Sequence, residues 1–282
     1  KTFKESNLRK TSIEKYKRTI KHIKARFGDM QIANLDVVEC QTIFNGIDKP
    51  SVKDDCFSLL KEMLNKAVIC RYIDFNPLNA VEIKKHKKKH GKAFTREQEE
   101  RFVLACETNY RGLALVIGLY CGLRRGEILA LTTDDIHLDE RYIVINKQMQ
   151  NGEVVPPKTD SGNRNVPIID VLYPYLKDID FSKHERLFPI KEHAILEHFH
   201  NALKASGLDD MGFTLHTLRH TYTTRCAENN ISIAVTQKWV GHATSDMTQN
   251  VYTHVNDDFE KEEIAKFNKG VNDTINQVKK AV

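Results

Sequence analysis

The chain has 282 residues, of which 40% are hydrophobic and 29% charged, and its formal net charge is +5 at pH 7. This length exceeds that of a typical single domain, so we expect two domains, each with its own core. No apolar run approaches the roughly 20 residues that span a bilayer, and the first ten residues lack the apolar stretch of a signal peptide. These features exclude a membrane protein, and we expect a cytoplasmic location.

The six cysteines are spread along the chain without a CxxC pair. They lie in segments with apolar periodicity, which favours reduced thiols that act as small core residues. We therefore expect no zinc site. The cysteines are Cys40, Cys56, Cys70, Cys106, Cys121 and Cys226.

The charge is distributed unevenly. Residues 1–95 contain 21 Lys plus Arg and 11 Asp plus Glu, a net charge of +10, whereas the remainder carries −5. A basic module of this size suits a phosphate-backbone partner, because the released counterions drive affinity. A lysine-rich surface that is merely solvated is the alternative.

The first predicted helix begins near a capping box formed by Thr11 and Glu14. Apolar residues follow at helical spacing until Gly28 ends the pattern. We therefore expect an amphipathic helix in this segment.

Two further helices are predicted before the first domain ends. A short one covers residues 37–44 and a long one residues 52–71, with Asn76-Pro77 as the stop signal. Residues 1–83 should form an all-helical domain whose outer faces carry the lysines.

A basic linker is predicted over residues 84–94. Residues 84–91 contain five lysines and no apolar side chain, so this segment should be exposed and able to lie along a phosphate backbone. The lysines are Lys84, Lys85, Lys87, Lys88 and Lys89.

The second domain, residues 95–282, should combine helices with a small antiparallel sheet. Thr95 and Gln98 form another capping box, and residues 113–121 read as a buried helix that Gly122 interrupts. From residue 141 to 168 the pattern alternates, which is typical of strands. The alternating residues are Tyr142, Val144, Val154, Val155, Val166 and Ile168, separated by turns at Asn151-Gly152 and Ser161-Gly162.

Helical periodicity then returns over residues 192–206, 217–229, 233–240 and 245–254, with a final amphipathic stretch over residues 259–278. The fold class predicted for the whole chain is therefore mainly α with a small antiparallel β-sheet.

His216 and Arg219 stand three residues apart at the head of a predicted helix, so both should project from one face. There an imidazole and a guanidinium could meet one anionic oxygen. A surface pair or a capping histidine is the structural alternative for this short motif.

Arg124 follows the buried helix, and a guanidinium at such a place needs an anionic partner. Glu127 lies three residues on. The two could form a purely structural ion pair, or Glu127 could orient an arginine that faces phosphate. Arg125 should point about a quarter-turn away, so only one of the two arginines can face the site.

Three more residues complete the set of candidates. Lys158 lies between two predicted strands, where a hairpin could deliver an ammonium group to a leaving-group oxygen. His242 follows Gly241, and Tyr252 lies on the next predicted helix. Taken singly, each has a structural explanation, as a solvated lysine, a capping histidine or a buried tyrosine.

In the order GLRRGE, PKTDSGNR, HTLRH, GHATS and TQNVYTH, these segments resemble the tyrosine recombinases, or phage integrase family. The resemblance implies a helical core-binding domain followed by an α+β catalytic domain. The KTxxSxR form of the hairpin, from Lys158 to Arg164, is most similar to integrases of phages and integrative conjugative elements. Such integrases often carry an N-terminal arm-binding domain, and the start at Lys1 favours a chain from which it was trimmed.

The resemblance also implies a role for each candidate. Arg124 and Arg219 become the phosphate-clamping arginines, Lys158 the hairpin lysine, and Tyr252 the nucleophile. The two histidines are His216, the box histidine, and His242.

The chemistry that follows is metal- and ATP-independent strand transfer. Tyr252 would attack a DNA phosphate while the cationic groups neutralise the transition state, so neither a metal nor another cofactor is expected. Lys158 would protonate the 5′-hydroxyl that leaves, and a 3′-phosphotyrosyl bond would conserve the ester energy. Whether His216 acts as general base or mainly as hydrogen-bond donor stays open.

The expected partners are double-stranded DNA, further copies of the chain and a possible directionality factor. The resemblance implies a dimer on one site and a tetramer in the synaptic complex, in a bacterial cytoplasm. The tail over about residues 256–282 should pack on a neighbouring protomer, with folding back on its own domain as the alternative.

Two other functions compete with site-specific recombination or integration of a mobile element. A type IB topoisomerase uses similar residues on one duplex without partner exchange. A DNA-binding architectural or regulatory protein could retain the pocket without its activity.

Overall fold

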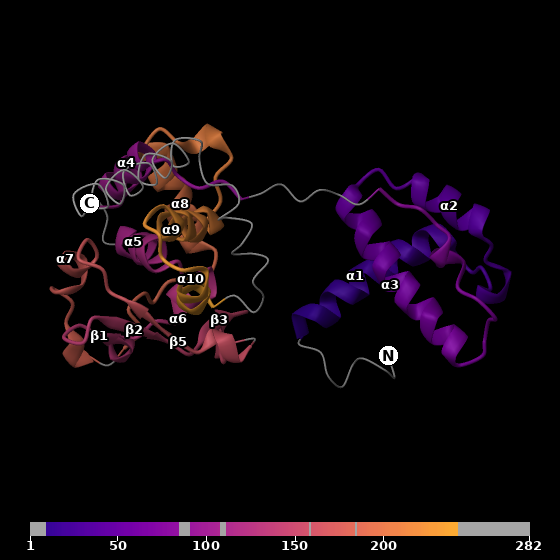
Figure 1. Cartoon of the computed structure of the whole chain (residues 1–282), viewed down its shortest axis with the longest axis horizontal. Helices are drawn as coiled ribbons and strands as arrows, with labels where there is room; N and C mark the ends of the chain where they lie inside the picture. Colours follow the sequence, from indigo (N-terminus) through magenta and orange to yellow (C-terminus); the bar gives the residue numbers. More distant parts are fainter. Residues whose placement is uncertain (1–9, 85–90, 108–110, 158, 184, 242–282) are drawn as a thin grey trace, which may run out of the picture. The chain divides into compact units, whose positions relative to one another are not determined.

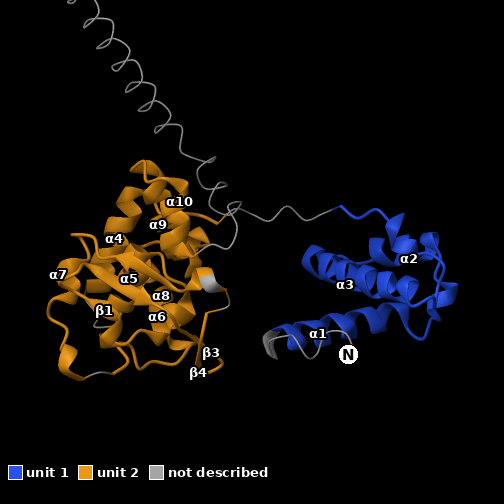
Figure 2. Ribbon diagram, turned by 60° about the horizontal axis from the view of Figure 1, so that its bottom comes forward, with its two compact units in different colours: residues 1–89 blue, residues 90–282 orange. Residues whose placement is uncertain are grey.

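The structure is a computed structural model that describes residues 10–84, 91–107, 111–157, 159–183 and 185–241. The chain divides into two compact units, residues 1–89 and residues 90–282, coloured separately in Figure 2. The boundary falls inside the segment predicted as the linker. Within the described ranges, no helix combines the length and apolar character needed to cross a bilayer.

The first unit is built from three helices, α1 (Lys10–Phe27), α2 (Val37–Asn45) and α3 (Pro50–Ile69), with two short 3₁₀ turns, η2 (Ile32–Asn34) and η3 (Pro77–Asn79) (Figure 1). Its core joins all three helices with the 3₁₀ turn η3. The largest fully buried side chains there include Phe44, Ile47, Leu64 and Leu78.

Two helix boundaries in this unit differ from the predictions. Helix α1 already includes Lys10, so Thr11 lies inside the helix and is not its cap. Helix α3 begins at Pro50, because proline suits the first helical turn, and ends at Ile69, well before Asn76-Pro77. Gly28 does follow α1 in the left-handed region, with φ +56°.

Among the described residues of the second unit, the α-helices are α4 (Arg96–Glu107), α5 (Gly112–Cys121), α6 (Arg125–Ala130), α7 (Tyr173–Leu176), α8 (Ala194–Ala205), α9 (His216–Glu228) and α10 (Ile233–Val240). The predicted capping box is confirmed, since Gln98 N donates to Thr95 Oγ1 and Thr95 N donates to Gln98 Oε1. The predicted 245–254 helix and 259–278 stretch lie outside the described residues.

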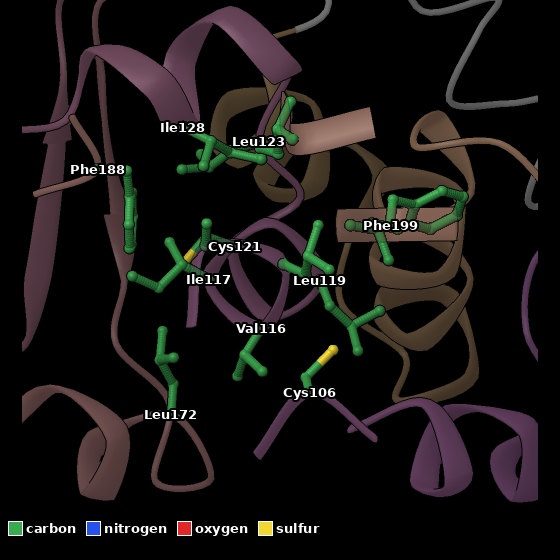
Figure 3. Packing of buried hydrophobic residues seen from close by; sticks show 14 of the residues in the cluster. Cys106, Val116, Ile117, Leu119, Cys121, Leu123, Ile128, Leu172, Phe188 and Phe199 are labelled. Carbon is green, nitrogen blue, oxygen red and sulfur yellow. The ribbon is translucent and has the colours of Figure 1, made fainter. Parts of the chain in front are cut away.

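The core of the second unit surrounds α5, which is apolar on every side. Figure 3 shows Leu119 of this helix on the side of Cys106 and Phe199, whereas Ile117 lies on the side of Phe188 and Leu172. Gly122 ends the helix with φ +63°. The next residues therefore leave the core in a fixed direction, which places Arg124 at the start of α6.

The predicted antiparallel β-structure is confirmed, and within the described residues it is divided into two small sheets. Strands β1 (Ile136–His137), β2 (Tyr142–Ile145) and β5 (Arg164–Pro167) form one antiparallel sheet, and β3 (Gln148–Gln150) and β4 (Glu153–Val155) form a separate hairpin. The hairpin turns at Asn151-Gly152, as predicted, with both φ values positive.

In β2 the residues that the alternation singled out are not the ones that the fold buries. Ile143 and Ile145 are buried, while Tyr142 and Val144 are only half-buried. All four residues favour strands, so alternation by itself could not decide which pair faces the core. The pairing of Ile143 with Val166 sets the register.

The cysteines are free thiols, and five of them are buried as predicted. Cys70 is the exception, because it is the exposed C-cap of α3 rather than a core residue.

Candidate active site

Arg124 occupies the N-cap position of α6, directly after the turn at Gly122 and the buried Leu123. Its backbone N–H donates to Glu127 Oε2 at 2.8 Å and its side-chain Nη1 donates to Glu127 Oε1 at 2.9 Å. Nη2 donates to the carbonyl of Gly241 at 2.8 Å. The guanidinium is therefore held between α6 and the end of α10, while about a third of the side chain stays open to solvent.

Arg125 is directed elsewhere, as helix geometry predicts. Its Nη2 lies 3.3 Å from Glu192 Oε2. Of the two adjacent arginines, only Arg124 joins the group described here.

Glu127 is buried and is shared between two arginines. Besides Arg124, it binds Arg164, whose Nη2 lies 2.8 Å from Oε2 and whose Nη1 lies 3.1 Å from Oε1. Burial alone would raise the pKa of Glu127, but the hydrogen bonds and charge of Arg164, with Arg124, outweigh it and hold the pKa at about 2. The carboxylate is ionised and forms a structural ion pair with Arg124, and its role in orienting Arg124 towards a phosphate stays a prediction.

Arg219 is the most deeply buried candidate, with only 2% of its surface exposed. It lies one turn into α9, and its Nη1 donates to the carbonyl of Gly122 at 2.9 Å. Its Nη2 is buried and has no hydrogen-bond partner among the described residues. A buried N–H of a guanidinium needs an acceptor, so this atom is suited to an anionic oxygen from a ligand.

His216 is the first residue of α9, and His220 follows one turn later. Their rings meet nearly edge to face, with centroids 4.9 Å apart. The pKa of His216 is lowered by partial burial, then by His220 and by the charges of Arg219 and Arg124. Because the His216 side chain is also exposed to water, solvent weakens this effect, but the neutral imidazole is favoured at pH 7.

The structure thus brings four predicted residues, Arg124, Glu127, His216 and Arg219, into one group, where each is within electrostatic range of the others. Three predicted residues, Lys158, His242 and Tyr252, lie outside the described residues. Of the linker lysines, Lys84 is exposed, while Lys85, Lys87, Lys88 and Lys89 also lie outside the described part. In that part, no group of three or more His, Cys, Asp or Glu side chains could hold a metal ion.

Arg164 was missed as a site residue by the sequence reasoning, although it ends the KTxxSxR pattern. Its side chain is 1% exposed, and it bonds Glu127 as well as two backbone carbonyls. The feature of the sequence that could have indicated a role for Arg164 is its place as a charged residue in a predicted, half-buried strand. Nothing in the local sequence indicated that its partner would be Glu127, 37 residues earlier.

Comparisons with known proteins indicate the family of this chain. The model of the phage integrase family matches residues 92–258, and that of the phage integrase N-terminal SAM-like domain matches residues 1–47. Transposase A of transposon Tn554 from Staphylococcus aureus is 27% identical over 205 residues, covering 64% of this chain and 54% of that protein. The chain therefore spans about half the length of the first such relatives. The integrase of Staphylococcus phage L54a is 26% identical and covers 92% of this chain and 87% of that protein.

Solved structures show the same fold. The Tn1549 transposon integrase in complex with a circular intermediate DNA has a TM-score of 0.76 at 20% identity, covering 93% of this chain and 95% of that one. A lambda integrase dimer bound to a COC′ core site has a TM-score of 0.67 at 20% identity, covering 88% and 90%. Since the family model alone matches more than half of the chain, this protein belongs to the phage integrase, or tyrosine recombinase, family.

Proposed function

We propose that this protein is a site-specific DNA recombinase that integrates or excises a mobile element through a 3′-phosphotyrosyl intermediate. The observation that carries the proposal is the buried Nη2 of Arg219, which has no hydrogen-bond partner in the described part of the chain and lies within electrostatic range of Arg124 and His216. Two guanidiniums and a neutral imidazole at one place suit a phosphodiester, whose non-bridging oxygens gain charge in the transition state. Membership of the family supports this assignment.

In this proposal Tyr252 Oη gives up its proton, to His216 or to water, as it forms a bond to the phosphorus atom, and the bond from phosphorus to O5′ breaks. Lys158 transfers a proton to O5′, and Arg124 and Arg219 neutralise the non-bridging oxygens. His216 and His242 bind or move protons at the same phosphate. Attack by a 5′-hydroxyl of another duplex reverses the step and rejoins the strands, so no ATP is consumed.

The proposed domain roles follow the two units. Residues 1–83 bind DNA as the core-binding domain, residues 84–94 are the basic linker, and residues 95–282 are the catalytic domain. The five linker lysines contact phosphates, which position the protein without reading sequence. A location in the bacterial cytoplasm, where the DNA lies, fits this role.

The proposed assembly is a dimer on one site and a tetramer in the synaptic complex. A lambda integrase tetramer bound to a Holliday junction has the same fold as this chain, with a TM-score of 0.65. The tail at about residues 256–282 would contact a second copy. A cavity of about 550 Å³ between α4, α5, α9 and α10, lined by Leu104, Tyr120, Tyr222 and Trp239 among others, offers an apolar surface for such a contact.

The decisive experiment uses a nicked suicide duplex that carries the element's end, incubated with purified protein in EDTA. The proposal expects a covalent adduct that disappears in Tyr252→Phe and persists in Tyr175→Phe. The control removes a hydroxyl that bonds Glu107. Tight binding without an adduct would favour the DNA-binding protein that lacks activity.

A second experiment separates recombination from topoisomerase activity. Plasmids with and without the element's ends are incubated with the protein, and topology and recombinant products are followed together. Recombinants that require two ends support the proposal. Efficient relaxation of a plasmid that carries no end would favour a type IB topoisomerase.

A further inference from the structure

The buried guanidinium of Arg164 connects three segments that are far apart in the sequence. Arg164 begins β5, and its two terminal nitrogens bind both carboxylate oxygens of Glu127 on α6. Its Nε donates to the carbonyl of Trp239 near the end of α10, at 2.6 Å, and Nη1 also reaches the carbonyl of Gly162 at 3.1 Å. The planar fork of an arginine makes this set possible, and a lysine ammonium could not reproduce it.

The end of α10 packs directly against this guanidinium. Gly241 ends the helix with φ +65°, and a Cβ atom there would lie 3.1 Å from Arg164 Nη1 and 2.8 Å from the carbonyl oxygen of Ser161. The backbone therefore approaches Arg164 as closely as only glycine permits. The position of the Gly241 carbonyl depends on this contact.

Both anchors of Arg124 are thus held by Arg164. The first anchor is the carboxylate of Glu127, which binds Arg124 Nη1, and the second is the carbonyl of Gly241, which binds Arg124 Nη2. Arg164 binds the carboxylate of Glu127 directly. It also donates to the carbonyl of Trp239, two residues before Gly241, and so fixes the end of α10. Within the described residues, these two hydrogen bonds are what holds the partly exposed guanidinium of Arg124.

We infer that Arg164 is a positioning residue for DNA cleavage, acting through Glu127 and Gly241 to hold Arg124 against the scissile phosphate. The inference rests on the proposed function. Because only 1% of the Arg164 side chain is exposed, it acts through the groups to which it is bonded. Residues that orient a functional ligand typically contribute about 10- to 100-fold to activity, so an effect of that size is expected.

The test is a single-turnover cleavage assay of Arg164→Lys on two suicide duplexes. One carries the ordinary scissile phosphodiester, and the other carries a neutral methylphosphonate, which lacks the negative charge that Arg124 neutralises. Total strand scission is measured. Arg164→Lys should lose about 10- to 100-fold on the phosphodiester and much less on the methylphosphonate, with Arg124→Ala showing the same pattern more strongly.

Arg225→Lys is the matched control. Arg225 is a partly buried arginine in the same unit, and its guanidinium is likewise bonded to carboxylates, those of Glu99 and Glu228, and to the carbonyl of Phe94. Its replacement should destabilise the fold without changing the ratio of the two cleavage rates. An equal ratio in the wild type and Arg164→Lys would overturn the inference.

A double-mutant cycle gives an independent outcome. If Arg164 acts through Arg124, Arg124→Ala/Arg164→Lys should cleave no more slowly than Arg124→Ala alone, whereas multiplied losses would contradict the relay. If Arg164→Lys does not fold, Glu127→Gln tests the same relay with nearly unchanged volume. A wild-type protein that forms no adduct would refute the proposed function, and that result is distinct from every outcome of the cycle.

Discussion

Arg219 and Gly122 lie 97 residues apart in the sequence, yet Nη1 of the arginine donates to the glycine carbonyl at 2.9 Å. The carbonyl is presented by the left-handed turn that ends α5, with φ +63°. A Cβ atom at Gly122 would lie 2.6 Å from the buried ring of Tyr222. The turn therefore sets the position of Arg219 and tolerates only glycine.

Gly122→Ala should consequently damage both stability and activity. Left-handed backbone strain costs about 1 kcal/mol, and displacement of the Tyr222 ring adds about 1–3 kcal/mol. Urea unfolding measures the loss of stability, and single-turnover cleavage measures the loss of activity caused by the shifted Gly122 carbonyl.

Gly212→Ala is the matched control for this change. Gly212 has φ +68° in the same unit, but nothing lies within 4 Å of a Cβ atom there. The Gly212→Ala variant should be destabilised only by the backbone strain, and its cleavage rate should stay at the wild-type value. Equal unfolding midpoints for the two variants would contradict the predicted role of Tyr222.

The ion pair between Glu127 and Arg164 predicts an acid-sensitive fold. The pKa of Glu127 is about 2 in the folded protein against 4.5 as a reference, so its stabilising contribution is full above about pH 4.5 and is lost as the pH falls towards 2. For this buried group the shift corresponds to about 3 kcal/mol. At pH 6 the free energy of unfolding of Glu127→Gln should be lower than that of the wild type. Between pH 6 and pH 2.5 it should also fall less steeply than the wild-type value. Glu153→Gln, at an exposed position of β4, should follow the wild-type curve.

His216 and His220, at the start of α9, predict how the cleavage rate falls at low pH. Burial and then the neighbouring His220 lower the pKa of His216, so the neutral imidazole persists below pH 6.5. Replacing His220 by Gln removes this neighbour and should raise the pKa of His216, moving the acid limb to higher pH. Titration of the His216 ring by NMR checks the shift directly. His200→Gln is the control on α8, and an unchanged His216 titration in His220→Gln would refute the coupling.

The linker lysines predict the salt dependence of DNA binding. Each phosphate contact contributes about 0.9 to the slope of log K against log salt concentration, so replacing all five lysines by Ala should reduce the slope by up to about 4–5. Binding isotherms at several salt concentrations measure it. A control with three exposed lysines of the second unit changed to Ala should leave the slope unchanged: Lys177, Lys183 and Lys191. An equal reduction in both proteins would indicate general charge attraction rather than contact by the linker.

The sequence by itself determined the features that depend on near neighbours. The capping box of Thr95 and Gln98, the break at Gly122 and the shared face of His216 and Arg219 all follow from helix geometry over three or four residues. The ordered motifs were sufficient to indicate the family, because each is a short local pattern.

Only the tertiary structure decided which distant groups meet. The choice of Ile143 and Ile145 as the buried residues of β2 came from pairing with β5, since both faces of β2 are apolar enough to be buried. The pairing of Glu127 with Arg164, and of Arg219 with the Gly122 carbonyl, likewise required α6, β5, α9 and α10 to pack around one core. Such contacts join segments tens of residues apart, and their energy depends on burial, which no local pattern encodes.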